Sequence, residues 1–283
     1  MAENRGSQNP METVAELTEQ VNALKTRVKF KTSLMIFIIA LLVMVTATLA
    51  WFTVSGLAGT DGLDLNCTTG NDLRIATSNR GSDISAYERE VTSEMVDAQL
   101  KQNSFKPLAD IKLAPLSTRN ASSNIGTRLF LQNGTERTTE GPKNGQFLQF
   151  SVWLISSGDT TVYLTDKESE AGKADGTKIT SGKTNNTSQA NVVKAARISF
   201  EPEGEATRIY ETESRPYASN QTNAFSNISG QTDANKICTL SANTPKQVTI
   251  RVWIEGEDPL CVDNIQSSQF SIQLMFEGEK TGE

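Results

Sequence analysis

"QFLQFSVWLISSGDTTVYLTD", residues 146–166, alternates apolar and polar side chains on both sides of a short turn. A period of two residues is typical of a strand that buries one face. Four apolar residues share the buried face of the first half: Leu148, Phe150, Val152 and Leu154. Ser-Ser-Gly-Asp supplies the turn, and the alternation resumes at Val162 and Leu164. The stretch therefore predicts a β-hairpin.

The same alternation recurs in the C-terminal part of the chain. "QVTIRVWIEGED" (247–258) and "FSIQLMFEGE" (270–279) read as strands, and "NVVKAARISFEP" (191–202) is a further candidate. Seven more residues face inward in this pattern: Val248, Ile250, Val252, Ile254, Ile272, Leu274 and Phe276. Strands with one polar face and long polar connections are typical of an antiparallel β-sandwich. We expect one all-β domain over residues 73–283, with a helix or loop at 84–104.

Two tryptophans occupy matching outward positions on these strands. Trp153 and Trp253 each alternate with the predicted core residues of their own strand. An aromatic side chain on an outer face packs under a covering loop or contributes to a subunit interface. Both residues are therefore candidate interface positions.

A long apolar run, "TSLMIFIIALLVMVTATLAWFTVSG" (32–56), precedes this domain. The 19 residues from Leu34 to Phe52 carry no charge. At ~1.5 Å per residue they span nearly ~30 Å, the thickness of a bilayer's hydrocarbon core. The run predicts a single transmembrane helix at 33–52, through which the protein contacts the cell membrane.

The flanks of the apolar run set its orientation. Four basic residues and no acid lie just before it: Lys25, Arg27, Lys29 and Lys31. The positive side of a membrane segment stays in the cytoplasm, so the C-terminal domain is expected outside the cell. Residues 1–32 are expected to form a cytoplasmic amphipathic helix with a basic flank, and residues 53–72 an extended lead-in or linker. Length favours a retained anchor, and cleavage after Ala50 with secretion is the alternative.

Composition excludes several classes of function. The chain has no histidine, so it offers no histidine-based zinc site and no Ser-His-Asp triad. The formal net charge is −6, and no glycine-rich phosphate loop links a strand to a helix. The acidic clusters at 60–66 and 255–259 read as solvated strand ends rather than calcium sites. We expect no enzymatic activity, no catalytic, metal or cofactor site, and neither nucleic acid nor nucleotide as partner.

The three cysteines, Cys67, Cys238 and Cys261, all follow the apolar run. Outside the cell, one disulfide and one remaining thiol are the arithmetic expectation. Cys238 with Cys261 closes the shorter loop and is the preferred pair. Three unpaired, buried thiols are the alternative.

Several stretches together resemble a known family. "ATLAWFTVSG" (47–56) followed by "GTDGLDLN" (59–66) looks like the start of the TasA/camelysin-type exported β-sandwich surface proteins of Gram-positive bacteria (Firmicutes). "FSVWLISSGDTTVYLTD" (150–166), "AARISF" (195–200) and "VWIEGEDPLCVDNIQSSQFSIQLMF" (252–276) resemble their sandwich strands. The resemblance covers roughly residues 46–66 and 146–279.

The resemblance implies a jelly-roll-like sandwich at the cell surface whose subunits assemble into fibres of a biofilm-type matrix. In such fibres a neighbour's N-terminal strand completes each sandwich. Cleavage after Ala50 would create a candidate donor strand from four residues: Trp51, Phe52, Thr53 and Val54. The metallopeptidase activity described for some relatives does not carry over to a chain without histidine. A membrane-anchored binding module for carbohydrate or another surface ligand is the alternative function.

Overall fold

The computed structural model describes Met35 and residues 59–68, 72–120, 123–124, 128–168, 176–182, 190–213, 223–261 and 268–281. The chain divides into two compact units, Met1–Ser55 and Gly56–Glu283. Apart from Met35, the expected cytoplasmic segment, membrane helix and donor strand lie outside the described residues. Among the described residues, no helix has the length and apolar composition needed to cross a bilayer.

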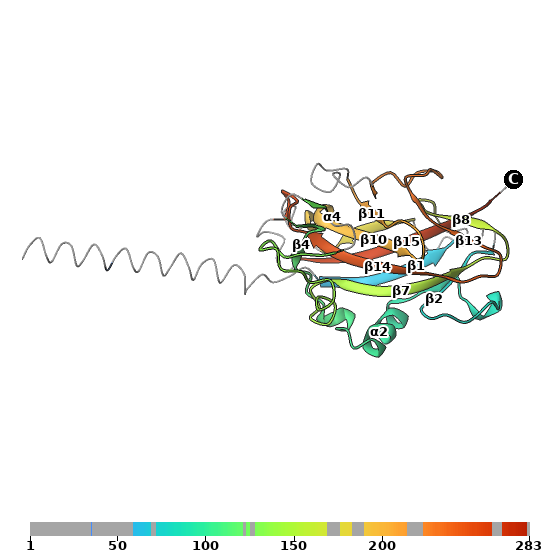
Figure 1. Cartoon of the computed structure of the whole chain (residues 1–283), viewed down its shortest axis with the longest axis horizontal. Helices are drawn as coiled ribbons and strands as arrows, with labels where there is room; N and C mark the ends of the chain where they lie inside the picture. Colours follow the sequence, from blue (N-terminus) through green and yellow to red (C-terminus); the bar gives the residue numbers. More distant parts are fainter. Residues whose placement is uncertain are drawn as a thin grey trace, which may run out of the picture. The chain divides into compact units, whose positions relative to one another are not determined.

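Two β-sheets form the described part of the second unit (Figure 1). One sheet has six described strands: β1 (Gly59–Cys67), β3 (Glu90–Val91), β8 (Thr160–Leu164), β9 (Lys178–Ser181), β13 (Lys236–Leu240) and β15 (Gln269–Lys280). The other has seven: β2 (Arg74–Ala76), β4 (Pro115–Leu116), β7 (Leu148–Ile155), β10 (Ala196–Pro202), β11 (Arg208–Glu211), β12 (Ala224–Phe225) and β14 (Lys246–Glu255). A separate pair is formed by β5 (Arg119–Asn120) and β6 (Ser123–Asn124).

The order of neighbours in the first sheet is β13-β8-β15-β1-β3, with β9 beside the first half of β15. In the second sheet it is β12-β11-β10-β14-β7-β2, with β4 beside the end of β14. Four short helical elements accompany the described strands: η2 (Ile84–Ala86), α2 (Ser93–Gln102), η3 (Leu108–Asp110) and α4 (Val192–Ala195).

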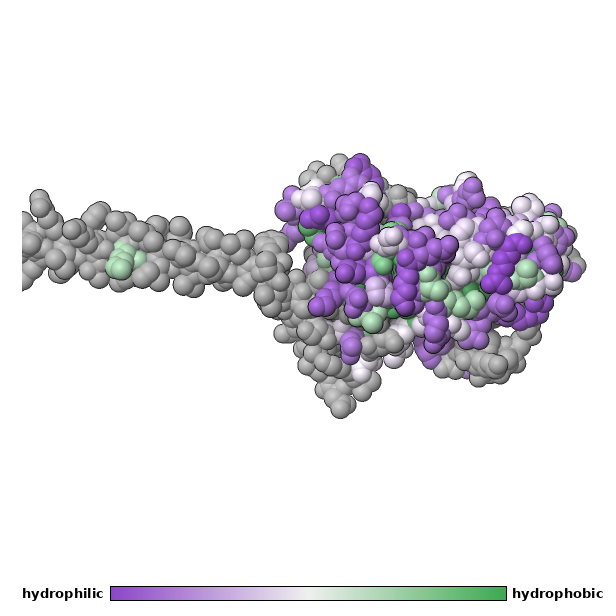
Figure 2. Space-filling model, turned by 90° about the horizontal axis from the view of Figure 1, so that it is seen from below, coloured by the Kyte–Doolittle hydropathy of each residue, from purple (hydrophilic) through white to green (hydrophobic). Residues whose placement is uncertain are grey.

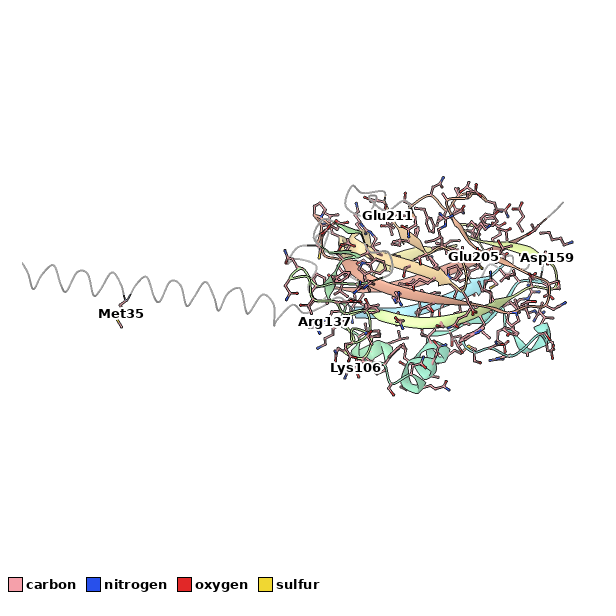
Figure 3. The ribbon with its side chains drawn as sticks, in the orientation of Figure 1. Met35, Lys106, Arg137, Asp159, Glu205 and Glu211 are labelled. Carbon is pink, nitrogen blue, oxygen red and sulfur yellow. The ribbon has the colours of Figure 1, made fainter. Side chains whose placement is uncertain are left out.

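Glu205 on the β10–β11 turn and Glu211 at the end of β11 mark opposite ends of that strand pair (Figure 3).

The predicted core is confirmed. All eleven inward residues from the three alternating stretches are at most 2% exposed: Leu148, Phe150, Val152, Leu154, Val248, Ile250, Val252, Ile254, Ile272, Leu274 and Phe276. Phe200 and Phe276 meet edge to face, with ring centroids 6.0 Å apart, which joins the two sheets. The fold is all-β, as two-residue periodicity predicts.

The expectation of an antiparallel sandwich is confirmed in part, because most described strand pairs are antiparallel but both sheets are mixed. Three pairs are parallel: β1 with β15, β11 with β12, and β14 with β4. The predicted hairpin is wrong. β7 pairs with β14 and β2, whereas β8 pairs with β13 and β15, so the turn at 156–159 crosses from one sheet to the other. Alternation shows only that each strand buries one face. The pattern is the same whether two consecutive strands pair in one sheet or lie in different sheets.

The lead-in expected at 53–72 is extended, but over Gly59–Cys67 it is an inner strand rather than a linker. Leu63 and Leu65 are fully buried, and the strand lies between β15 and β3. The sandwich therefore begins before residue 73. Only two apolar residues alternate here, among Gly and Asp, so the segment carried too weak a strand pattern to be recognised.

The face that carries α2 is hydrophilic. Figure 2 shows this side of the molecule, where hydrophobic residues appear only in small groups between polar ones. Within the second unit, no described large hydrophobic residue is exposed. Val96 and Leu100 instead turn the apolar side of α2 into the core. The helix thus occupies part of the segment expected to be helix or loop.

Candidate functional site

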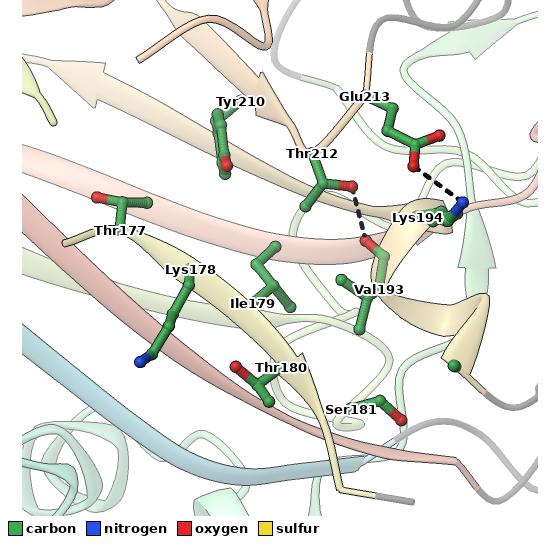
Figure 4. A pocket seen from close by; sticks show the side chains of 11 residues that line it. Thr177, Lys178, Ile179, Thr180, Ser181, Val193, Lys194, Tyr210, Thr212 and Glu213 are labelled. Carbon is green, nitrogen blue, oxygen red and sulfur yellow. Dashed lines mark hydrogen bonds and ion pairs between the residues drawn. The ribbon is translucent and has the colours of Figure 1, made fainter. Parts of the chain in front are cut away.

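A hollow of about 430 Å³ lies between β9, α4 and the end of β11 (Figure 4). Ile179 of β9 and Val193 of α4 supply apolar lining. Residues 177, 180, 181 and 212 contribute hydroxyl groups, and Lys178 contributes an ammonium. The lining therefore combines a small apolar surface with several hydrogen-bonding groups, the mixture found in sites for small polar ligands.

Two contacts hold the walls of this hollow together. The Thr212 hydroxyl donates to the Val193 carbonyl at 3.2 Å, and Lys194 Nζ lies 2.9 Å from Glu213 Oε1 (Figure 4). Both partners of the ion pair are more than 40% exposed, so the pair contributes less than about 1 kcal/mol. These contacts join α4 to the chain that follows β11.

Tyr210 borders the hollow as a buried phenol. Its ring packs at a tilt against Phe225, with centroids 5.7 Å apart. Burial, and after it the negative charge of Asp166, raises the pKa of Tyr210 to about 12. The hydroxyl therefore stays protonated at neutral pH.

Behind the hollow lies a buried charge cluster, which we define as Arg197, Glu211, Glu255 and Asp258. Arg197 is 0% exposed, and its Nη2 donates to Asp258 Oδ2 at 2.9 Å. Its Nε lies 3.3 Å from Glu211 Oε2, close enough for an ion pair but at an angle that makes no hydrogen bond. Nη1 donates to the carbonyls of Lys194 and Ala196, at 2.8 and 2.9 Å. Arg197 therefore fixes both the end of α4 and the end of β11.

The cluster holds more acidic than basic groups. One guanidinium faces three carboxyl groups, each at most 3% exposed. Burial raises the pKa of Glu255, and hydrogen bonds from Ser117 and the Glu257 amide together with the charge of Arg197 offset part of the rise. The Trp253 indole also donates to Glu255 at 3.3 Å. The raised pKa means that burial favours the protonated form of Glu255.

One expectation is corrected at this cluster. The acidic stretch 255–259 was expected to be solvated, but Glu255 and Asp258 are buried and their counter-charge is Arg197. Trp253 was expected on the outer face of its strand, either packed under a covering loop or at a subunit interface. It is 1% exposed and belongs to the main buried hydrophobic cluster, which agrees with packing and contradicts the interface role. Within the described residues, no group of three or more His, Cys, Asp or Glu side chains is placed to hold a metal ion.

Trp153 is partly buried on the outer face of β7, where it packs against Ala76, Tyr87 and Ile155. This agrees with packing under a covering segment, which was one of its two expected roles. Its role as an interface residue remains a prediction.

The expected Cys238–Cys261 disulfide is not formed, and all three cysteines are free thiols. The charges of Lys246 and Glu205 act on Cys238, whereas those of Glu255 and Asp258 act on Cys261. Lys246 and Glu255 are the two ends of β14, which nine steps of ~3.3 Å separate by about 30 Å. A disulfide requires Cα atoms within about 7 Å. The short sequence loop was misleading because an extended strand fills it.

Sequence reasoning missed the charge cluster. It also missed Ser93 and Gln99 of α2, whose side chains bond to the backbones of β1 and β7. A signal was present: Arg197 interrupts the apolar strand "AARISF", and a lone charge among inward and outward apolar residues indicates a buried pair. Its partners lie 14 and 61 residues away in sequence, Glu211 and Asp258, and only the strand pairing brings them together. The candidate donor residues Trp51, Phe52, Thr53 and Val54 lie outside the described residues.

Comparison of the chain with protein-family models, with curated proteins and with solved structures found no match. The resemblance to TasA/camelysin-type proteins therefore stays an expectation from the sequence.

Proposed function

We propose that this chain is a cell-surface structural protein that assembles into fibres by β-strand addition. The observation that carries the proposal is the position of β1. It is the first described strand of the sandwich, yet it lies inside a sheet, parallel to the last described strand, β15. The residues just before it, Trp51 to Val54, are aromatic and β-branched, and they are a suitable strand for a neighbour's sheet.

In this proposal residues 33–52 anchor the chain in the cell membrane, with the N-terminus in the cytoplasm and the sandwich outside. Cleavage after Ala50 releases Trp51 as a new N-terminus, and Phe52 and Val54 insert into a neighbouring jelly-roll-like sandwich. Without cleavage the same residues stay at the membrane, and the protein is a monomeric display domain. Protease added to intact cells should then digest the sandwich; protection of the sandwich would contradict this topology.

Two polypeptides test the assembly. One begins at Trp51 and the other at Thr60, so both retain nearly all of β1 and its pairing with β15. Electron microscopy and sedimentation should show fibres from the longer polypeptide and monomers from the shorter one. Fibres from the shorter chain, or none from the longer chain, would refute donor-strand assembly.

A matched pair of substitutions in the longer polypeptide sharpens this test. Phe52→Asp places a charge on the face proposed to insert, whereas Thr53→Asp places the same charge on the opposite face of an extended segment. Burying an unpaired carboxylate is costly, so Phe52→Asp should abolish fibres and Thr53→Asp should leave them. Equal loss in both variants would show that net charge rather than insertion controls assembly.

The hollow beside α4 favours a second candidate function, a binding module for carbohydrate. Its hydroxyl groups and the Tyr210 phenol match the hydrogen-bonding needs of a sugar, and Ile179 and Val193 offer apolar contact. Binding of the purified chain to a glycan array, lost in Ile179→Asp and kept in the more distant Thr239→Ala, would support this candidate. An array without any bound glycan would remove it.

A further inference from the structure

The side chain of Gln99 takes the place of a strand beside β7. Its Nε2 donates to the Ser151 carbonyl at 2.8 Å, and its Oε1 accepts from the Ser151 amide at 2.8 Å. Nε2 also donates to the Thr77 carbonyl. One carboxamide thus makes with Ser151 the pair of hydrogen bonds that an antiparallel neighbour would make.

The register of β2 shows which residue Gln99 replaces. β2 pairs with β7 from Arg74 opposite Ile155 to Ala76 opposite Trp153. Continuing this register places Ser78 opposite Ser151, but the chain leaves β7 after Ala76. Gln99 enters at that point and extends the ladder by one position. Beyond it, no described strand lies along this edge of β7.

The other end of α2 does the same for β1. β3 pairs with β1 through Glu90 opposite Asn66 and Val91 opposite Leu65, a register that continues to Ser93 opposite Leu63. There the Ser93 hydroxyl accepts from the Leu63 amide at 3.0 Å and donates to the Leu63 carbonyl at 2.8 Å. Six residue steps along the helix lead from Ser93 to Gln99, a rise of about 9 Å. This matches the ~10 Å between packed sheets, so α2 closes both sheet edges at once.

β7 is the strand that most needs such a cover. Its sequence, LQFSVWLI, holds no charge, glycine or proline and is rich in residues that favour strands. Uncharged segments of this kind pair readily with identical copies when an edge is exposed. The other sheet edges carry short strands or charges: β9 and β13 begin with Lys178 and Lys236, and Glu205 Oε1 accepts from the Thr239 amide of β13 at 2.9 Å.

We propose that the β7 edge around Ser151 is a latent self-association surface, which Gln99 on α2 keeps closed in the wild type and which opens only when this guard is removed. The partner is β7 of a second copy of this chain, paired antiparallel across a two-fold axis. In this arrangement the backbone groups of two identical edges can hydrogen-bond to each other, and no like charges are brought together. Pairing at this edge does not require the donor residues 51–54.

The test compares three forms of the full chain in detergent micelles. Gln99→Leu removes the guard and leaves an apolar side chain. Gln99→Glu keeps an acceptor for the Ser151 amide but removes both donated bonds and places a charge at the edge, which opposes strand pairing. Sedimentation over a range of concentrations reports association, and amide exchange at Ser151 reports whether the edge is paired.

The dilute Gln99→Leu form should exchange the Ser151 amide about tenfold faster than the wild type, because one net hydrogen bond is lost. At high concentration it should associate and regain protection at Ser151, whereas wild type and Gln99→Glu should not change with concentration. Monomers of Gln99→Leu at every concentration would overturn the proposal. So would association without protection at Ser151, or equal association of Gln99→Glu, since both indicate general destabilisation.

If Gln99→Leu does not fold, Gln99→Asn carries the same comparison. It shortens the side chain by one methylene and withdraws the amide from Ser151 while keeping its polarity. Concentration-dependent protection at Ser151 supports the guard role. Protection that stays at the wild-type level at every concentration overturns it. Loss of fibres from the polypeptide beginning at Trp51 would bear on the donor strand alone, so the two proposals fail separately.

Discussion

The side of the sandwich that carries α2 and the side that carries α4 are closed by different chemistry. On the α2 side, the neutral side chains of Ser93 and Gln99 bond to strand backbones. On the α4 side, Arg197 holds a one-turn helix and the end of β11 through buried ionic contacts. Neutral bonds hardly respond to pH, whereas a buried excess of carboxyl groups does. The two sides should therefore weaken under different conditions.

The largest expected effect is on the α4 side. Arg197→Met removes the only described basic side chain in the buried charge cluster and leaves Glu211 and Asp258 without its charge. Removing one partner of a buried ion pair costs about 3–5 kcal/mol. Denaturant unfolding of the variant should show a loss of this size.

Lys194→Met is the matched control, because it breaks the exposed pair between Lys194 of α4 and Glu213, which follows β11. Its cost should stay below about 1 kcal/mol. A comparable loss in both variants would mean that burial of the cluster does not set the stability of this side.

On the α2 side, Ser93→Ala removes the hydroxyl that serves both the amide and the carbonyl of Leu63. Leaving buried backbone groups unpaired costs about 1–3 kcal/mol. The exposed Ser85→Ala should stay within about 0.5 kcal/mol. Unfolding curves for Ser93→Ala and Ser85→Ala that coincide would show that water replaces the hydroxyl and that this edge is open.

Only the α4 side is expected to change in stability with pH. Because burial raises the pKa of Glu255, the folded state binds this proton more tightly than the unfolded state does. Its contribution to stability is complete below the ordinary glutamate pKa and is lost as pH rises through the raised pKa of the folded state. Glu255→Gln should remove this loss, so the difference in stability between variant and wild type should grow in favour of the variant with rising pH.

The exposed Glu203→Gln serves as the control for Glu255→Gln. Chemical denaturation across the acidic to neutral range measures all three forms. A pH-independent difference between Glu255→Gln and wild type would contradict a raised pKa at this site. Ser93→Ala should show no such dependence, because its partners do not titrate.

The smallest effect concerns the thiols of Cys238, on β13, and Cys261, which follows β14. Burial raises the pKa of Cys238 and Cys261 to about 12, so both are protonated at neutral pH and react slowly. Cys261 is only partly buried, so it should be alkylated first in the native chain. Mass spectrometry after denaturation should find three alkylated cysteines, and a disulfide between Cys238 and Cys261 would contradict the extended β14 that separates them.

The sequence predicted what depends on local periodicity. Val152 and Ile250 could be assigned to the core because each alternates with polar neighbours along its own strand. The pattern does not say which strands are neighbours, so it could not show that β7 and β8 belong to different sheets. Arg197 and Glu211 could not be paired, because their contact depends on the register of β10 with β11. Gln99 reads as an ordinary helix residue until the edge of β7 is seen beside it.

The parallel pairing of β1 with β15 has a mechanical consequence. The pair runs from Gly59 opposite Gln269 to Cys67 opposite Phe276, so the start of β1 and the end of β15 lie at opposite ends of it. Tension that draws the two ends of the sandwich apart slides these strands along each other and loads all their hydrogen bonds together. In an antiparallel terminal pair the same tension would open the bonds one at a time. The sandwich is thus built to bear traction between its N-terminal and C-terminal strands.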